Sequence, residues 1–96
     1  MIYMIIDVDG KKYKLVKDYK DAFDEAEFLS KFTDYFYDYD YIVGDISYGK
    51  LRLKGFNLKN SSGFNSINDY DKLEKYLKEN CTYDCKYFIL KKENVW

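Results

Sequence analysis

The sequence contains no histidine and no proline among its 96 residues, and it has two cysteines, Cys81 and Cys85. The absence of histidine excludes Ser–His and Cys–His catalytic pairs, together with every zinc site that needs an imidazole ligand. The absence of proline excludes polyproline segments and cis-proline turns. Two cysteines are too few for a disulfide-rich secreted scaffold. We therefore expect a protein that is not an enzyme and that carries no cofactor and no metal.

Long hydrophobic runs and a large excess of one charge are absent as well. Sixteen Lys and Arg residues are opposed by 17 Asp and Glu residues, so the net charge is −1. The apolar start, Met1–Val8, lacks the basic flank of a signal peptide and is far shorter than the ~20 residues of a membrane span. These features predict a cytoplasmic protein without a membrane partner. With 47% apolar and 34% charged residues, the chain is typical of a single globular domain over residues 1–96.

Two β-hairpins are predicted from their turns. Asp9-Gly10 lies between two β-prone runs, which is a strong hairpin signal, and Tyr48-Gly49 marks a second turn. The period of two places Ile6 and Val8 on one face of the first strand. The four strands are expected over Ile2–Val8, Lys12–Lys17, Tyr41–Ile46 and Lys50–Phe56.

Two helices are predicted from capping residues and apolar periodicity. The first begins at Asp24, which forms an acidic capping box with Glu27, or at Asp21, and it ends between residues 33 and 36. The second runs from residue 68 or 69 to about residue 80. The apolar stripes are expected to consist of Ala22, Ala26, Leu29 and Phe32 or Thr33, with Phe28 beside them, and of Tyr70, Leu73, Tyr76 and Leu77.

The last strand determines the expected fold class. Tyr87–Leu90 is apolar on both faces, which is typical of a strand in the middle of a sheet that is covered on both sides. The order of elements is then β-β-α-β-β-α-β. We expect an α+β fold with two β-hairpins, a C-terminal central strand and helices packed on the sheet.

The second hairpin contains the most informative pattern. Alternation places Lys50, Arg52 and Lys54 on one face of a strand, with charges spaced by about 6.6–7 Å. Tyr48 and Phe56 flank this row and could stack on nucleic-acid bases. These five residues are the candidate binding residues. The alternative is an ordinary solvated face of an antiparallel strand.

Arg52 is the single arginine beside fifteen lysines, which favours the hypothesis that its position needs the planar, five-donor guanidinium. Asp45 lies near it across the hairpin and is expected to orient it. Three glycines support this motif, and turns and a bulge are their simplest explanation: they are Gly44, Gly49 and Gly55. A phosphate-binding loop is disfavoured, because Leu51 occupies the Ser/Thr position of that motif.

Two other groups of residues carry side chains that suit metal or thiol chemistry. Aspartates at positions 34, 38, 40 and 45 could ligate Mg²⁺, but solvated charges around an aromatic cluster are the preferred interpretation, with Asp45 beside Arg52 as the exception. Cys81 and Cys85 form a thiol pair. Buried reduced thiols at the end of the second helix are favoured over a reversible disulfide or half of a shared metal site.

The central segment also resembles a known family. Its motif runs over Tyr39–Asp45 and continues through Tyr48–Phe56, and in these residues the chain is similar to the YutD-like family. The likeness extends to Tyr13–Asp18, Ala22-Phe23, Tyr76-Leu77, Cys81, Cys85 and Tyr87–Lys92, so it covers nearly the whole chain. Ile46-Ser47 replaces the usual Trp-Gly, and Asp84 replaces a common glycine. The resemblance implies a layered α/β domain among small cytosolic proteins of low-GC Gram-positive bacteria and their relatives, without an established activity.

These observations favour a non-catalytic binding or regulatory module. The basic hairpin face is expected to contact an anionic partner, with RNA or an RNA–protein assembly as the first choice and an acidic protein surface as the second. One alternative is a homodimer or protein-interaction module that uses the aromatic segment Tyr35–Tyr41. The other is a thiol- or metal-dependent enzyme that uses Cys81 and Cys85. The oligomeric state, monomer or homodimer, is left open.

Overall fold

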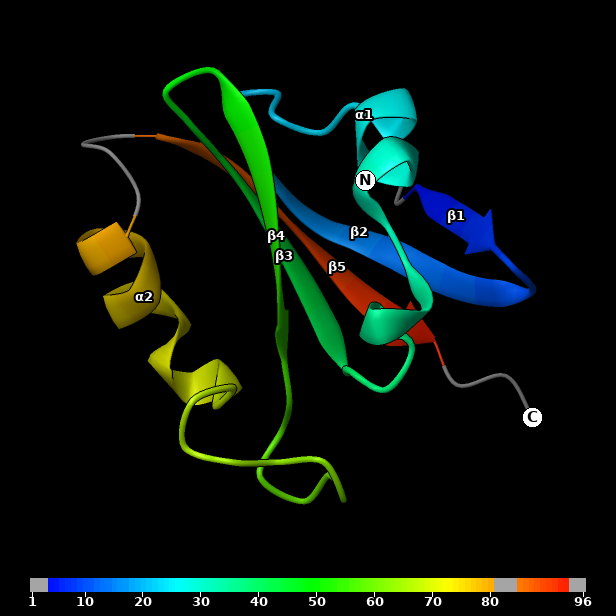
Figure 1. Cartoon of the computed structure of the whole chain (residues 1–96), viewed down its shortest axis with the longest axis vertical. Helices are drawn as coiled ribbons and strands as arrows, with labels where there is room; N and C mark the ends of the chain where they lie inside the picture. Colours follow the sequence, from blue (N-terminus) through cyan, green and yellow to red (C-terminus); the bar gives the residue numbers. More distant parts are fainter. Residues whose placement is uncertain (1–3, 81–84, 94–96) are drawn as a thin grey trace.

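The computed structural model describes residues 4–80 and 85–93, which form one five-stranded antiparallel sheet with helices on both faces (Figure 1). The strand order is β1-β2-β5-β3-β4. This confirms the predicted α+β class and the order β-β-α-β-β-α-β. The strands are β1 (Ile5–Val8), β2 (Lys11–Tyr19), β3 (Tyr41–Ser47), β4 (Lys50–Phe56) and β5 (Lys86–Glu93).

Both predicted hairpin turns are present. Asp9 and Gly10 have φ values of 53° and 80°, and Tyr48 and Gly49 have φ values of 54° and 75°. Two consecutive residues with positive φ define the type I′ turn, whose twist matches that of the strands it joins. The turns therefore fix the registers of β1 with β2 and of β3 with β4 from local sequence alone.

The first helix, α1 (Glu25–Lys31), begins as predicted but ends earlier. Oδ1 of Asp24 accepts a hydrogen bond from the backbone N–H of Glu27 at 3.1 Å. The helix stops at Lys31, and a short 3-10 helix, η1 (Asp34–Phe36), occupies the expected last turn. Phe28 is the buried residue of α1. The predicted stripe is thus rotated, since Leu29 is exposed.

The second helical segment combines a 3-10 turn, η2 (Tyr70–Lys72), with α2 (Leu73–Asn80). Its start confirms the prediction, because the side chain of Asp69 accepts a hydrogen bond from the backbone N–H of Asp71 at 3.0 Å. The four predicted apolar residues of this segment all pack in one cluster under α2: they are Tyr70, Leu73, Tyr76 and Leu77. Within the described residues, no helix is long and apolar enough to span a membrane.

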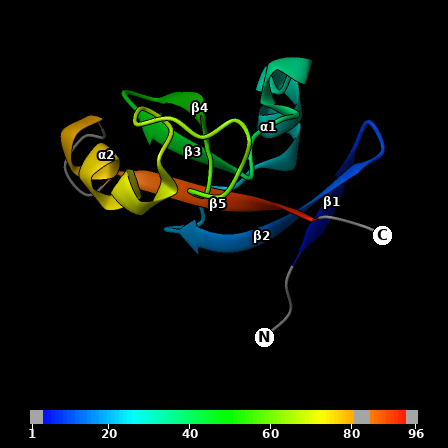
Figure 2. The ribbon, with the colours of Figure 1, turned by 90° about the horizontal axis from the view of Figure 1, so that it is seen from below.

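The sheet separates two apolar clusters, with α1 and α2 on opposite faces (Figure 2). Phe88 and Leu90 of β5 point into the cluster beneath α1, and Ile89 points into the one beneath α2. These three side chains are between 0% and 6% exposed. Strand β5 is therefore central and covered on both faces, as its sequence predicts, and β4 lies at the edge of the sheet.

Candidate anion-binding groove beside strand β4

The side chains of β4 alternate between the two faces of the sheet, as predicted. The register pairs Arg52 with Asp45 and Lys54 with Val43, and Val43 belongs to the cluster beneath α2. Leu51 belongs to the cluster beneath α1. The three cations of β4 therefore share one face. Beside Lys54 that face is bounded by α2 and forms a groove between a strand and a helix, whereas Lys50 and Arg52 are exposed to solvent.

Among the described residues, the guanidinium of Arg52 forms hydrogen bonds and an ion pair with groups of the same chain. Its Nε and Nη2 atoms lie 2.9 and 2.8 Å from Oδ1 of Asp45, whose side chain is fully buried. Nη2 also donates to the backbone carbonyl of Asn80 at the end of α2. Several acceptors in different directions need the branched guanidinium, which explains why lysine does not occupy this position. The expectation that Asp45 orients Arg52 is confirmed. The hydrogen bond from Arg52 to Asp45 raises the pKa of the guanidinium.

The same carboxylate also holds a side chain of α2. Oδ2 of Asp45 accepts a hydrogen bond from the hydroxyl of Tyr76 at 3.2 Å. Burial, followed by the charge of Asp45, raises the pKa of Tyr76 to about 12, so the hydroxyl remains a donor at neutral pH. Asp45 and Arg52 therefore join β3, β4 and α2 through hydrogen bonds, beside the apolar cluster beneath the helix.

Lys54 and Phe56 line the wall next to this network. Nζ of Lys54 is 5.2 Å from the ring centroid of Phe56 and 5.7 Å from that of Tyr76. Phe56 is only 1% exposed, because its ring fills the space between the sheet and α2. It therefore does not offer the exposed ring that the base-stacking hypothesis requires. Tyr48, the other aromatic residue of that hypothesis, is 90% exposed.

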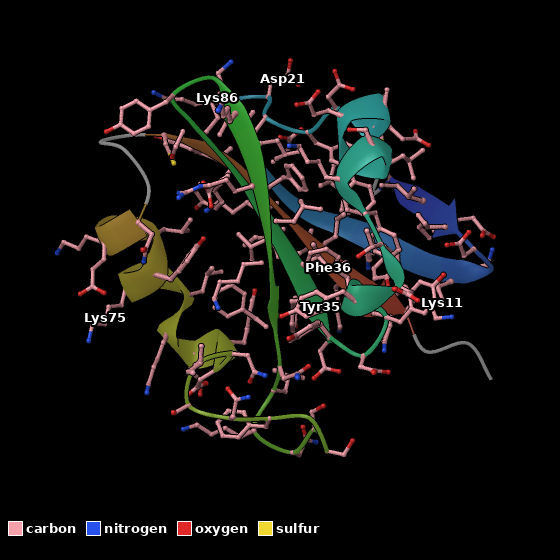
Figure 3. The ribbon with its side chains drawn as sticks, in the orientation of Figure 1. Lys11, Asp21, Tyr35, Phe36, Lys75 and Lys86 are labelled. Carbon is pink, nitrogen blue, oxygen red and sulfur yellow. The ribbon has the colours of Figure 1, made fainter. Side chains whose placement is uncertain are left out.

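Two lysines that the sequence analysis did not select complete the groove. Lys72 of η2, Lys75 of α2 and Lys54 of β4 line one cavity of about 270 Å³. The acidic residue in the same lining is Glu79, so positive charge exceeds negative charge. Lys75 projects from α2 in Figure 3. We call this site the lysine groove. The spacing of three residues between Lys72 and Lys75 was a usable signal, since it places both on one side of a helical segment.

A second cavity, of about 300 Å³, lies along the other side of β4. Tyr35, Tyr39 and Leu53 line it, and we call it the tyrosine groove. Lys54 and Ile67 line both cavities, so the two grooves lie side by side along the strand. Tyr35 is 66% exposed and Ile67 is 78% exposed. Figure 3 shows Tyr35 and Lys75 on either side of β4.

The three motif glycines have different roles. Gly49 forms the turn, as expected. Gly44 and Gly55 lie within regular strands, so the expected turn or bulge is wrong for them. A Cβ at Gly44 would lie 2.2 Å from the ring of Phe88, and one at Gly55 would lie 2.2 Å from the ring of Tyr39. Both positions make room for an aromatic ring and neither forms a phosphate-binding loop.

The remaining candidates are distributed elsewhere. Cys85, directly before β5, is disulfide-bonded, so the expectation of a reduced thiol is wrong for it, and Cys81 lies outside the described residues. Asp34 and Asp38 are exposed, and Asp40 accepts a hydrogen bond from the backbone N–H of Leu58 at 2.9 Å at a partly exposed position. Asp45 is buried against Arg52, as expected. In the described ranges, no group of three acidic or cysteine side chains could hold a metal ion.

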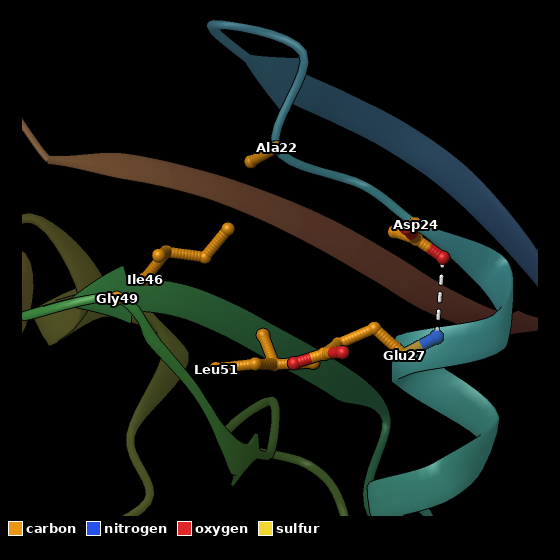
Figure 4. A pocket seen from close by; sticks show the side chains of 6 residues that line it. All are labelled: Ala22, Asp24, Glu27, Ile46, Gly49 and Leu51. Atoms are coloured by element: carbon orange, nitrogen blue, oxygen red, sulfur yellow. Dashed lines mark hydrogen bonds between the residues drawn. The ribbon is translucent and has the colours of Figure 1, made fainter.

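A smaller cavity of about 140 Å³ lies between the start of α1 and the second hairpin (Figure 4). Its polar side chains are Asp24 and Glu27, and the carboxylate of Asp24 also accepts the capping hydrogen bond from the backbone N–H of Glu27. Because both side chains are acidic, this cavity does not add to the cationic site, and we assign it no ligand.

The fold and groove define a small antiparallel α+β domain with a cationic edge. The chain belongs to the family described as "Putative antitoxin YutD-like", which matches residues 7–91. It is 38% identical over 85 residues to "Putative antitoxin YutD" of Bacillus subtilis (strain 168), covering 88% of this chain and 93% of that protein. It is also similar to the solution NMR structure of protein yutD from B. subtilis, with a TM-score of 0.79 and 36% identity over 95% of this chain and 83% of that chain. The resemblance seen in the sequence is confirmed.

Proposed function

We propose that this chain is a non-catalytic binding module whose lysine groove docks an acidic segment of a partner protein. The observation that carries the proposal is the convergence of Lys54, Lys72 and Lys75 on one cavity. These cations come from three elements, and the aromatic rings of Phe56 and Tyr76 line the same cavity. Ammonium groups beside apolar walls interact more strongly with carboxylates than fully solvated ones do.

The choice of a protein over RNA rests on the aromatic side chains. Non-specific binding of single-stranded RNA uses exposed rings on which successive bases stack. Phe56 is buried, which leaves Tyr48 as the exposed ring of the two that flank the cations of β4. The name of the relatives, "Putative antitoxin", suggests a partner of some kind and does not distinguish a protein from RNA. RNA binding remains the competing proposal, and the experiment below separates the two.

The test compares two anionic probes of equal length and charge, an acidic peptide and a single-stranded RNA. Fluorescence anisotropy measures the affinity of the full chain for each probe at several salt concentrations. We expect the peptide to bind, with affinity falling as salt rises. The variant Lys54→Glu/Lys72→Glu/Lys75→Glu should lose at least tenfold in peptide affinity.

The matched control is Lys31→Glu/Lys78→Glu/Lys91→Glu, which makes the same change of charge at exposed lysines outside the lysine groove. It should keep most of the peptide affinity. Equal losses in both variants would show that net charge alone drives binding and would overturn the site. Tighter binding of RNA than of peptide, with a loss in Tyr48→Ala, would overturn the protein partner in favour of RNA.

A further inference from the structure

Strand β4 has a backbone edge that faces away from β3. Ser47 and Lys50 flank the two-residue turn and face each other, so they form a hydrogen-bonded pair of the antiparallel ladder. Every second pair along the hairpin then bonds in the same way. The backbone N–H and C=O groups of Leu51, Leu53 and Gly55 consequently point away from β3, toward the outer edge of the sheet.

The molecule already pairs backbone on the continuation of this edge. The N–H of Asn57 donates to the carbonyl of Asn68 at 2.7 Å, and the N–H of Tyr70 donates to the carbonyl of Asn57 at 3.0 Å. Asn57 and Asp69 thus form an isolated parallel bridge. In the sheet of the described residues, β4 has β3 as its one neighbouring strand. The edge from residue 51 to residue 55 is therefore a continuation of a line along which backbone pairing already occurs.

The two grooves lie where the side chains of an added strand would point. Successive side chains of a strand point to opposite faces of the sheet. Beside β4, one face holds the lysine groove and the other holds the tyrosine groove. Lys54 and Ile67 line both, so a single extended segment on this edge would reach the two grooves in alternation.

We propose that β4 accepts an extended segment of a partner protein as a sixth strand, with acidic side chains toward the lysine groove and apolar side chains toward the tyrosine groove. This deepens the proposed function and rests on it. Backbone pairing would supply affinity through the outward groups of Leu51, Leu53 and Gly55, and the grooves would supply specificity. The required partner chemistry is an alternation of acidic and apolar residues over about six positions.

The cations of β4 also argue against a second copy of this chain as the occupant. Lysines on an edge strand discourage pairing between identical edges, because like charges then come to lie opposite one another. Lys50 and Lys54 of two antiparallel β4 strands would meet in this way. Acidic side chains of an added strand would instead be attracted by the lysines at these positions. The edge carries no proline, and its register with β3 is continuous from Ser47 to Tyr41, so no bulge protects it.

The experiment uses the full chain and a pool of ten-residue peptides in which Asp or Glu alternates with Val, Ile, Leu or Tyr. Three control pools share its composition. One is scrambled so that the alternation is lost, and the other two are N-methylated on the acidic or on the apolar residues. In an added strand the N–H groups of every second residue face β4, so either the acidic or the apolar residues donate to it. One of the two methylated pools should therefore bind far more weakly. Affinity is measured by anisotropy, and amide hydrogen exchange is followed by NMR at Leu51, Leu53 and Gly55.

Strand addition predicts at least tenfold tighter binding of the alternating pool than of the scrambled pool, and slower exchange of these three amides in the complex. Equal binding of all four pools, with a loss in the Lys54/Lys72/Lys75 variant, would overturn strand addition and leave the proposed function standing. Failure of every acidic pool to bind would overturn both. Slow exchange that depends on protein concentration without peptide would overturn the proposal in favour of self-pairing.

Discussion

The guanidinium of Arg52 and the carboxylate of Asp45 form an ion pair whose two sides have unequal access to water. The side chain of Arg52 is 46% exposed, whereas that of Asp45 is fully buried. A buried carboxylate is costly unless charged or polar donors surround it. Here Arg52 and Tyr76 supply those donors, and Tyr76 brings α2 into the network. The pair therefore supports one wall of the lysine groove.

We expect Arg52→Ala to lower the free energy of unfolding by about 2–3 kcal/mol, because the buried carboxylate of Asp45 loses its charged partner. Arg52→Lys should lose less, since the charge remains but the branched donor set does not. Urea unfolding followed by circular dichroism measures both. Lys50→Ala is the control on the same strand. If Arg52→Ala costs no more than this control, the ion pair does not hold the helix.

Tyr13 should make the fold sensitive to alkaline pH. Its hydroxyl is buried without a hydrogen-bond partner among the described residues, and burial raises its pKa to about 12. Because the pKa of Tyr13 rises on folding, ionisation of this group costs the fold no stability below pH 10, and stability falls as pH rises from 10 toward 12, where the unfolded chain ionises more readily. The loss is about 2–3 kcal/mol for a shift of this size.

Tyr13→Phe should remove most of that loss, and it should raise stability at pH 7 by about 1 kcal/mol because no unpaired hydroxyl remains buried. Unfolding measured at pH 7, 10 and 12 gives both quantities. The exposed Tyr48→Phe is the control. A variant that is less stable than the native chain at pH 7 would indicate that the hydroxyl of Tyr13 has a favourable partner.

Gly44 and Gly55 should respond differently to a methyl group. Both have an aromatic ring within 2.2 Å of the position of a Cβ. Phe88 is fully buried beside Gly44, while Tyr39 beside Gly55 is partly exposed and can move outward. Gly44→Ala should therefore cost about 3 kcal/mol or more, and Gly55→Ala about 1–2 kcal/mol. Thermal unfolding measures the two; the reverse order would show that Phe88 relaxes more easily than its burial suggests.

Tyr48 has a backbone conformation that favours other residues. Its φ of 54° lies in the left-handed region, where asparagine is more common, and its ring is 90% exposed. Tyr48→Asn should raise stability by about 0.5 kcal/mol, because no packing is lost and the turn is relieved. Gly49→Ala, the control, should cost about 1 kcal/mol. Destabilisation by Tyr48→Asn would contradict this account and assign the ring a structural contact.

Local features of the sequence determined the framework of this protein. Asp9-Gly10 and Tyr48-Gly49 dictate two-residue turns, and the period of two then fixes which face each side chain of the hairpins occupies. Asp24 starts a helix through a hydrogen bond to the third residue after it. These signals act over a few residues, so the fold class and the alternation along β4 could be predicted without coordinates.

The tertiary structure decided which of the predicted side chains are accessible and which cations act together. Phe56 is buried, Arg52 also donates to the backbone carbonyl of Asn80, and Lys72 and Lys75 come to lie beside Lys54. Each of these outcomes depends on where α2 packs on the sheet, through contacts such as Arg52–Asn80 and Asp45–Tyr76, which lie 28 and 31 positions apart in the sequence. Short-range periodicity assigns a side chain to a face, but it does not specify which element covers that face, because covering depends on contacts distant in sequence.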